Sequence, residues 1–467
     1  MASNTTVSRY LFRAYRAERT AFRHAQHRHL SSSAKRQMSA TGSQQTDGVF
    51  RALTDQRMQV PWIDAFRKQQ NGTVSLAKGP LPERDLTPKK MSDSYHSVIL
   101  PLAQEPFLLD TYLNSSGHIR LGTIFMDLDA LSGVIAYKHT GDSVTTVTAA
   151  FDRIIIKHPL TEICDLELSG QVSYTGKSSM EISLQVAKAP KAGEKVKKED
   201  VMITCQCTMV SLDPATKKPV QIPQVRTDTD DEKRVFAKGE TNSKRRKQLA
   251  QTSLLKIAPN DEESDLIHAM WQRQLKYHDP NDALRKPENV FFMDATRIST
   301  ASIMQPQYRN RHQYMVFGGF LLKQTFELAF CCAASFTHAR PSFVSLDPST
   351  FENPVPVGSI LYLEATVVYT DPPLVKTASD SDASNETSGQ TRIQVRVDSK
   401  VRNVEHGETK PTGQFNYTFL VDKDIKVMPR TYSEFMKYVD ARRRAKNVAE
   451  SVKGVDGSSG SMESIVE

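Results

Sequence analysis

A chain of 467 residues and 52.4 kDa is long enough for two or three domains, each with its own core. Its composition, with 39% hydrophobic and 24% charged residues, is that of a typical globular protein, and no run reaches the roughly 18 apolar residues that would span a bilayer. The net charge of +8 lies mostly in residues 1–38, where eight basic residues face the single acid Glu18. The rest is nearly neutral, which argues against a broad nucleic-acid-binding face.

The first 38 residues are rich in arginine and serine and poor in acids. This composition is typical of a mitochondrial transit peptide, so we predict import into the matrix; a disordered basic tail is the alternative. Residues 39–90 are polar and contain prolines, and they predict an N-terminal extension with one short helix at most.

An internal repeat organises the rest of the chain. The sequence VSYT at 172–175 returns as VVYT at 367–370, with Tyr174 and Tyr369 separated by 195 positions. Upstream of each lies a long apolar segment that opens on glycine, at Leu121-Gly122 and at Gly318-Gly319. We therefore predict two copies of one domain, at residues 91–215 and 289–425.

Each copy shows the same order of predicted elements. A strand-like lead (SVILPL at 97–102, NVFFMD at 289–294) is followed by a polar loop and then by the glycine-opened helix. Four or five strands follow, with apolar and polar residues alternating as in RIQVRVD, which is typical of half-buried antiparallel strands. One long helix and an antiparallel sheet predict an α+β domain whose sheet wraps the helix.

The remaining segments are expected to connect these domains. Residues 216–288 predict a charged linker with a helix near SDLIHAMWQRQLKY, and residues 371–390 an acidic, disordered surface loop inside the second sheet. Residues 426–467 predict a C-terminal helix and a flexible tail. The five cysteines, an odd number without a CxxC pair, indicate a reduced compartment and structural thiols.

The start of each glycine-opened helix is the candidate reaction site. Its first N–H groups lack helical partners, and glycine lets a carbonyl approach them closely, which stabilises an oxyanion in acyl transfer. Each helix also carries an acid about two turns on, and each is preceded by a loop asparagine, Asn114 or Asn310. Because the sequence lacks GxSxG, a serine nucleophile elbow is not expected.

In this combination the chain resembles the mitochondrial acyl-CoA thioesterases with two hotdog domains. The segments that carry the resemblance are MSDSYHSVILPL, IRLGTIFMDLDALSG, GQVSYTGKSSMEI, PQYRN…VFGGFLLKQTFELA and RPSFVSLDPSTFENPVPVGSILYL. The resemblance covers about residues 90–425. It implies two tandem hotdog domains with acyl-CoA bound at their seam and hydrolysed to free fatty acid and CoA. It also implies a homo-oligomer of such chains. No cofactor is predicted, and no metal is expected because the histidines form no HxxxH or HxH pair in the domains.

The resemblance and the repeat together name the candidate residues. Asp129, Asn310 and Glu327 are predicted to be catalytic, with a structural role at the seam as the alternative for Glu327. Gly122, Gly318 and Gly319 are predicted to hold the thioester oxygen. Asn114, Arg309 and Lys177 are predicted to bind substrate.

Two departures from the family pattern keep other functions open. Met315 occupies a position where many members have Asp or Asn, and Leu121 replaces a glycine. A non-catalytic hotdog protein that binds acyl-CoA or a protein partner is therefore an alternative. A hydratase is another, although the nearest histidine after the helix acids, His139, is too distant for its Asp–His pair.

Overall fold

The computed structural model describes residues 48–57, 60–70, 84–152, 154–156, 163–191, 193–194, 196–251, 254, 256–278, 285–311, 314–377 and 389–453. The predicted transit peptide and the flexible end of the tail lie outside these residues, as do positions 378–388 of the predicted surface loop.

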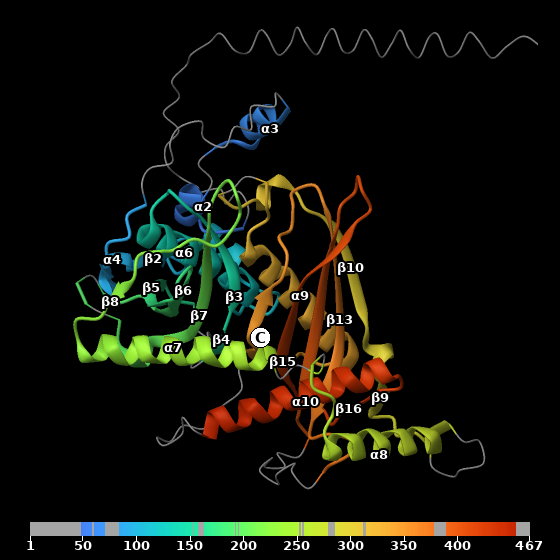
Figure 1. Cartoon of the computed structure of the whole chain (residues 1–467). Helices are drawn as coiled ribbons and strands as arrows, with labels where there is room; N and C mark the ends of the chain where they lie inside the picture. The colour runs from blue at the N-terminus through green and yellow to red at the C-terminus, as the bar shows by residue number, and fades with distance from the viewer. Residues whose placement is uncertain are drawn as a thin grey trace, which may run out of the picture. The chain divides into compact units, whose positions relative to one another are not determined.

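The chain repeats one series of elements (Figure 1). The first half contains β1 (Lys89–Lys90), α4 (Met91–Ser94), β2 (His96–Leu100), α5 (Pro106–Tyr112), α6 (Leu121–Thr140), β3 (Thr145–Phe151), β4 (Ile154–Ile156), β5 (Leu166–Thr175), β6 (Ser179–Lys188), η1 (Lys198–Asp200), β7 (Val201–Leu212), β8 (Val225–Arg226) and α7 (Asp230–Gln251). The second half contains β9 (Val290–Phe292), η2 (Met293–Thr296), β10 (Ile298–Ile303), η3 (Pro306–Tyr308), α9 (Gly318–Thr337), β11 (Ser342–Leu346), β12 (Ser349–Phe351), β13 (Ile360–Asp371), β14 (Thr391–Arg402), β15 (Thr409–Val421), β16 (Lys426–Met428) and α10 (Tyr432–Lys453). Helices α2 (Arg51–Arg57) and α3 (Trp62–Gln70) precede the first half, and α8 (Asp261–His278) lies between the two.

The two halves share one antiparallel sheet. Strands β2, β5, β6 and β7 follow one another in the first half, and β10, β13, β14 and β15 do so in the second. The halves join where β4 pairs with β11 and β3 pairs with β12, with Phe151 opposite Ser349. Each half of the sheet therefore has the same order, and the seam lies between two equivalent strands.

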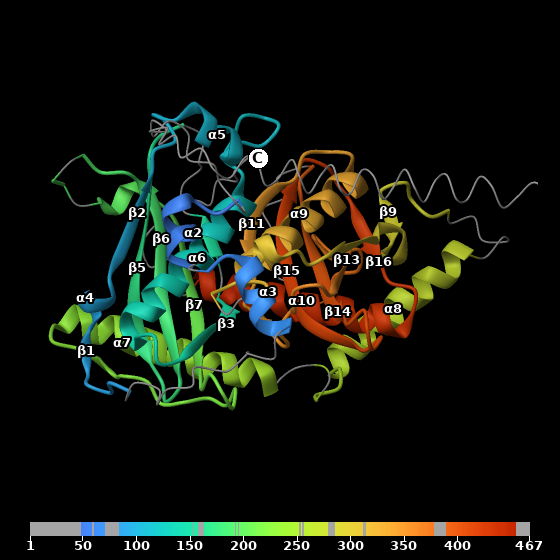
Figure 2. The same cartoon turned by 90° about the horizontal axis from the view of Figure 1, so that it is seen from above.

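The predicted glycine-opened helices are confirmed as α6 and α9, each 20 residues long. Both are buried on nearly every side, which agrees with their apolar sequences. They lie next to each other between the two halves of the sheet (Figure 2) and meet through aromatic rings such as Phe125 and Phe326, 5.3 Å apart edge to face. The α+β prediction, in which each half of the antiparallel sheet wraps a long central helix, is thus confirmed.

One predicted equivalence between the repeats is wrong. The segment NVFFMD was aligned with the lead strand SVILPL, but β9 pairs in parallel with β16 outside the large sheet. The counterpart of β2 is β10, which pairs with β13 as β2 pairs with β5. The prediction matched the two halves by their apolar residues. Strand β10 exposes most of its residues, so its sequence does not stand out as apolar.

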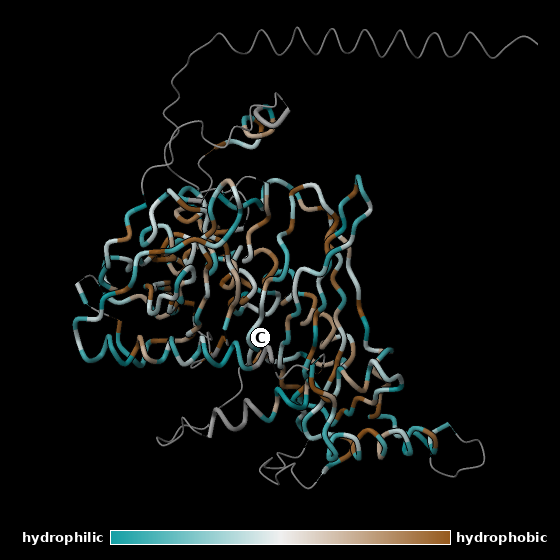
Figure 3. Tube along the Cα trace, in the orientation of Figure 1, coloured by the Kyte–Doolittle hydropathy of each residue, from teal (hydrophilic) through white to brown (hydrophobic). Residues whose placement is uncertain are grey.

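The charge runs of the predicted linker form a helix that sequence reasoning missed. Helix α7 has 22 residues and packs on β5, as α10 packs on β13 in the second half. In Figure 3 α7 is mainly hydrophilic, so it lacks the apolar stripe by which a helix is normally found. The helix predicted near SDLIHAMWQRQLKY is present as α8. The extension before residue 90 holds two helices, α2 and α3, where at most one was predicted.

No helix in the described part of the chain is long and apolar enough to cross a membrane.

Candidate active site

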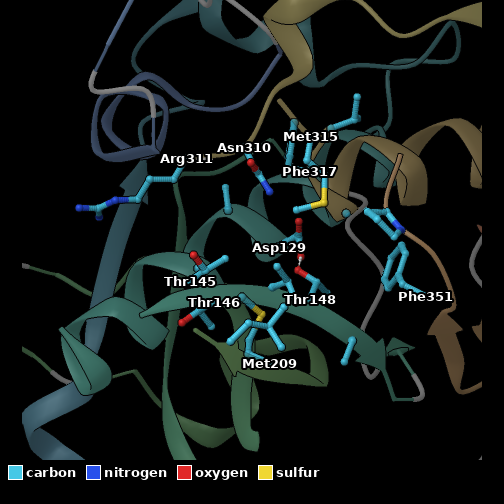
Figure 4. Close-up of a pocket in the computed structure, with 18 of the residues that line it drawn as sticks. Asp129, Thr145, Thr146, Thr148, Met209, Asn310, Arg311, Met315, Phe317 and Phe351 are labelled. Atoms are coloured by element: carbon cyan, nitrogen blue, oxygen red, sulfur yellow. Dashed lines mark hydrogen bonds between the residues drawn. The ribbon is translucent and has the colours of Figure 1, made fainter. Parts of the chain in front are cut away.

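A cavity of about 690 Å³ opens at the seam and is lined by both halves of the chain. The first half contributes one face of α6 and strand β3, and the second half contributes the loop before α9 and the segment after β12 (Figure 4). The lining includes Asp129, Gly133, Tyr137, Lys138, Thr146, Thr148, Met209, Lys217, Asn310, Arg311, Met315, Phe317, Gly318, Leu321, Phe351 and Val355.

Asp129 is the buried acid among the lining residues, only 4% exposed, whereas the other lining acid, Glu352, is exposed. Its Oδ1 accepts a hydrogen bond from the Thr148 hydroxyl at 2.8 Å, and its Oδ2 accepts one from the backbone N–H of Gly319 at 2.5 Å. Helix α9 has no side-chain cap of its own, so a carboxylate from the other half satisfies one of its free N–H groups. The positive end of the helix favours the charged form of that carboxylate.

The two glycines that open α9 are needed for this close approach. A Cβ on Gly319 would lie 2.8 Å from both the Asp129 Cβ and the Met126 carbonyl oxygen. A Cβ on Gly318 would lie 3.3 Å from Asp129 Oδ2, Thr148 and Phe351. Any side chain here would therefore push Asp129 away from the start of the helix.

Asn310 lies on the opposite wall of the cavity, above Asp129 in Figure 4. Its loop is held by the Asn310 N–H, which donates to the Met315 carbonyl at 2.7 Å. The neighbouring Arg311 donates to Asp142 at 2.8 Å, and its guanidinium lies 4.5 Å from the centre of the Tyr137 ring. The structure thus brings together Asp129, Asn310 and Gly318-Gly319 from the predicted set.

The start of α6, which is equivalent in the repeat to the start of α9, has different surroundings. Gly122, at the start of α6, faces Glu327 on α9, and a Cβ on it would lie 3.5 Å from Glu327 Oε1 and 3.3 Å from Lys323 Cγ. Glu327 accepts from the Arg120 guanidinium in an ion pair. Burial lowers the pKa of Lys323. The acid here is paired with a cation, whereas Asp129 accepts from the neutral Thr148 hydroxyl and Gly319 N–H.

Three predicted substrate-binding residues lie away from the cavity. Arg309 is 7% exposed and donates to the carbonyls of Pro306 and Val60, so its charge is used within the protein. The Asn114 side chain accepts from two N–H groups of its own turn. Lys177 is exposed in the turn between β5 and β6. None of the three lines this cavity, so their role in substrate binding stays a prediction.

Other lining residues were not found from the sequence. Thr148 lies in a strand with several threonines, and the alternation that marks the strand does not say which threonine meets an acid. The basic residues Lys138 and Lys217 carry no local motif. They become neighbours of the cavity only through the fold.

Cys207 is buried near Asp129, and burial together with the charge of Asp129 raises its pKa well above the ordinary value, so the thiol stays protonated. Among the residues that the structure describes, no cluster of His, Cys, Asp or Glu has the arrangement of a metal site.

Comparisons with known proteins point to one family, although no family model matches the chain. Human acyl-coenzyme A thioesterase 9, mitochondrial, is 34% identical over 370 residues, which cover 77% of this chain and 78% of the relative. The mouse protein of the same name is 31% identical over 400 residues, covering 83% and 85%. Among solved structures, an apo-hexameric acyl-CoA thioesterase aligns with 36% of this chain and 99% of its own, at 26% identity and a TM-score of 0.30.

A sheet wrapped around two central helices, with an acid of each helix facing the start of the other, defines a tandem hotdog protein. The chain belongs to the acyl-coenzyme A thioesterase family, which makes it an enzyme of the thioester hydrolase class.

Proposed function

We propose that this chain hydrolyses fatty acyl-CoA to free fatty acid and CoA in the seam cavity, with Asp129 as the working acid. The observation that carries the proposal is the contact of Asp129 with the start of α9, inside a cavity lined by both halves. Family membership supports the reaction class, and the contact of Asp129 with the start of α9 supports the proposed location of the site.

Asp129 would act as a general base on water. Its two oxygens accept from Thr148 and Gly319, which fixes the orientation of the carboxylate, and a carboxylate can accept more than two hydrogen bonds, including one from water. Water gives its proton to Asp129 while its oxygen bonds to the thioester carbonyl carbon. The C–S bond then breaks, and the proton passes to the CoA sulfur. General-base assistance of this kind contributes about 10²–10⁴-fold to the rate.

The developing oxyanion needs donors on the other side of the carbonyl. Gly319 was predicted as one, but its N–H is already bound to Asp129. The N–H of Gly318 is the better candidate, since it is the first residue of α9 and has no acceptor within the helix. The Asn310 side chain is proposed as the second donor, and one such donor contributes about 10²–10³-fold.

Basic side chains at the cavity suit the phosphates of CoA. Arg311, Lys138 and Lys217 all line it, in place of the predicted Arg309 and Lys177. The names of the mammalian relatives support a mitochondrial location, and the arginine-rich first 38 residues support our proposal of the matrix. Assembly of several such chains stays a prediction from the family resemblance.

The test is the release of free CoA thiol from a series of short to long acyl-CoAs by the purified chain. We expect hydrolysis of at least part of the series, with acid and CoA formed in equal amounts. Measurable acyl-CoA binding without hydrolysis of any member would reject the proposal in favour of the non-catalytic alternative.

A further inference from the structure

The segment before the first domain is built into the wall of the cavity. We call residues 48–57 and 60–66 the N-terminal strap; they comprise α2 and the first part of α3. The strap contacts α6 of the first half and the loop that precedes α9 of the second half, which are the two elements that carry Asp129 and Asn310.

The first part of the strap is anchored on α6, the helix that also carries Asp129. Val49 and Leu53 are fully buried, and the N–H of Phe50 donates to Asp127 Oδ1 at 2.9 Å. The other oxygen of Asp127 accepts from the Tyr112 hydroxyl at 2.5 Å. A fully buried carboxylate is costly unless it is hydrogen-bonded, so this contact fixes the strap two residues from Asp129.

The rest of the strap holds the opposite wall. The carbonyl of Val60 accepts from Arg309 at 2.8 Å, and the carbonyl of Ala65 accepts from the Tyr314 hydroxyl at 3.1 Å. The Trp62 ring also meets the Tyr314 ring edge to face, at 6.0 Å. Arg309 and Tyr314 flank the part of the loop that contains Asn310 and Arg311.

Between these anchors, α2 presents Gln56 to the cavity, where it lies among the lining residues. The side chain is exposed, and a carboxamide offers both a donor and an acceptor. In acyl-CoA, the pantetheine arm that joins the phosphates to the thioester carries two amides, whose N–H and C=O groups match a carboxamide.

We propose that the N-terminal strap is part of the acyl-CoA site, and that Gln56 binds an amide of the pantetheine arm. The proposal rests on the proposed function for the identity of the ligand. It assigns to a segment outside both hotdog domains a direct share in substrate binding.

The experiment compares the full chain with Gln56→Met, which keeps the length of the side chain and its helix propensity but removes the amide. Asp55→Asn is the matched control, because Asp55 is the exposed neighbour on the same helix and does not line the cavity. Binding of CoA and of adenosine 3′,5′-bisphosphate, which lacks the pantetheine arm, is measured by calorimetry for all three proteins.

We expect Gln56→Met to weaken CoA binding by about 3- to 10-fold, the usual worth of a neutral hydrogen bond, and to leave bisphosphate binding unchanged. In hydrolysis, KM should rise with kcat unchanged, since this contact is made equally in the ground and transition states. Asp55→Asn should leave the binding of both ligands unchanged.

Unchanged CoA binding by Gln56→Met would overturn the proposal, and so would an equal loss for both ligands, which would place Gln56 at the phosphates. Because CoA binding needs no turnover, a chain that hydrolyses nothing but shows the expected loss would reject the proposed function alone. A chain that binds no CoA would reject both.

Discussion

The carboxylate of Asp129 caps the helix whose second residue is Gly319, although the two residues are 190 positions apart. Glu327 faces Gly122 in the reverse direction, but with Arg120 beside it. The chain therefore contains two crossing points, where an acid of one central helix faces the start of the other. At the first, Asp129 accepts from Thr148 and Gly319 and lines the cavity; at the second, Glu327 pairs with Arg120. The two acids should respond differently to substitution.

Asp129→Asn should lower kcat by about 10²–10⁴-fold, because the amide cannot accept the proton of water. The side chain keeps its shape and one oxygen to accept from Gly319, so the fold should persist. Thiol release from acyl-CoA measures the effect, and circular dichroism checks the fold. A folded variant with undiminished kcat would remove Asp129 from the mechanism.

Glu327→Gln is the matched substitution at the other crossing point. The Arg120 and Glu327 side chains are 40% and 32% exposed, so loss of their ion pair should cost only about 0–1 kcal/mol in the free energy of unfolding. Hydrolysis should continue at the rate of the unchanged chain. If activity disappears here and survives in Asp129→Asn, the second half supplies the working acid.

Gly319→Ala should destabilise the chain by about 1–3 kcal/mol, because the added methyl group has no space beside Asp129 and Met126. Gly133→Ala is the control, since a Cβ there meets no atom within 4 Å. Alanine favours a helix over glycine by up to about 1 kcal/mol, so this control should be neutral or stabilising. Urea denaturation measures both; equal effects would show that the start of α9 is not tightly packed.

Stability should depend on pH through the carboxylates beneath α7. Arg246 on that helix pairs with both Asp152 and Glu181, which are nearly buried. Burial raises the pKa of Glu181 above its ordinary value of 4.5, and the charge of Asp152 raises it further. Burial also raises the pKa of Asp152.

A raised carboxyl pKa means that the folded state keeps the Glu181 proton at pH values above about 4.5, where the unfolded state is already losing it. The contribution of Glu181 to the free energy of unfolding therefore falls as the pH rises from about 4.5 through the raised pKa of the folded state. Glu181→Gln should gain stability relative to the unchanged chain as the pH rises above about 4.5, as measured by urea denaturation. A relative loss over the same range would mean that the ion pair, not burial, dominates.

Local patterns in the sequence were sufficient to predict both central helices and to name Asp129 and the glycines of α9 as candidate residues, but not their contact with each other. They failed where the partner of a side chain is set by contacts far along the chain. Arg309 and Lys177 carry charges that suit a phosphate, but only the fold shows that one binds backbone carbonyls and the other lies in a distant turn. A charge in a sequence does not state whether it is already in use.

The missed helix α7 had a signal of a different kind. Thr229 and Glu232 form reciprocal hydrogen bonds, a capping box, and Thr431 with Glu434 repeats it at the start of α10. The TxxE spacing in TDDE and TYSE would have marked both starts. Charge runs after such a box are better interpreted as the outer face of a helix than as a linker.

The two halves that join through β3 and β4 with β12 and β11 belong to one polypeptide chain. In an assembly of identical half-length chains, any substitution at the acid would appear at both crossing points at once. Here each can change alone, so Arg120 stands opposite Glu327 while Asp129 keeps its neutral donors. A single chain with two halves can therefore hold a different residue beside each acid. The second crossing point also has Gly48 next to it, where a Cβ would lie 2.8 Å from Met126 and 3.7 Å from Lys323.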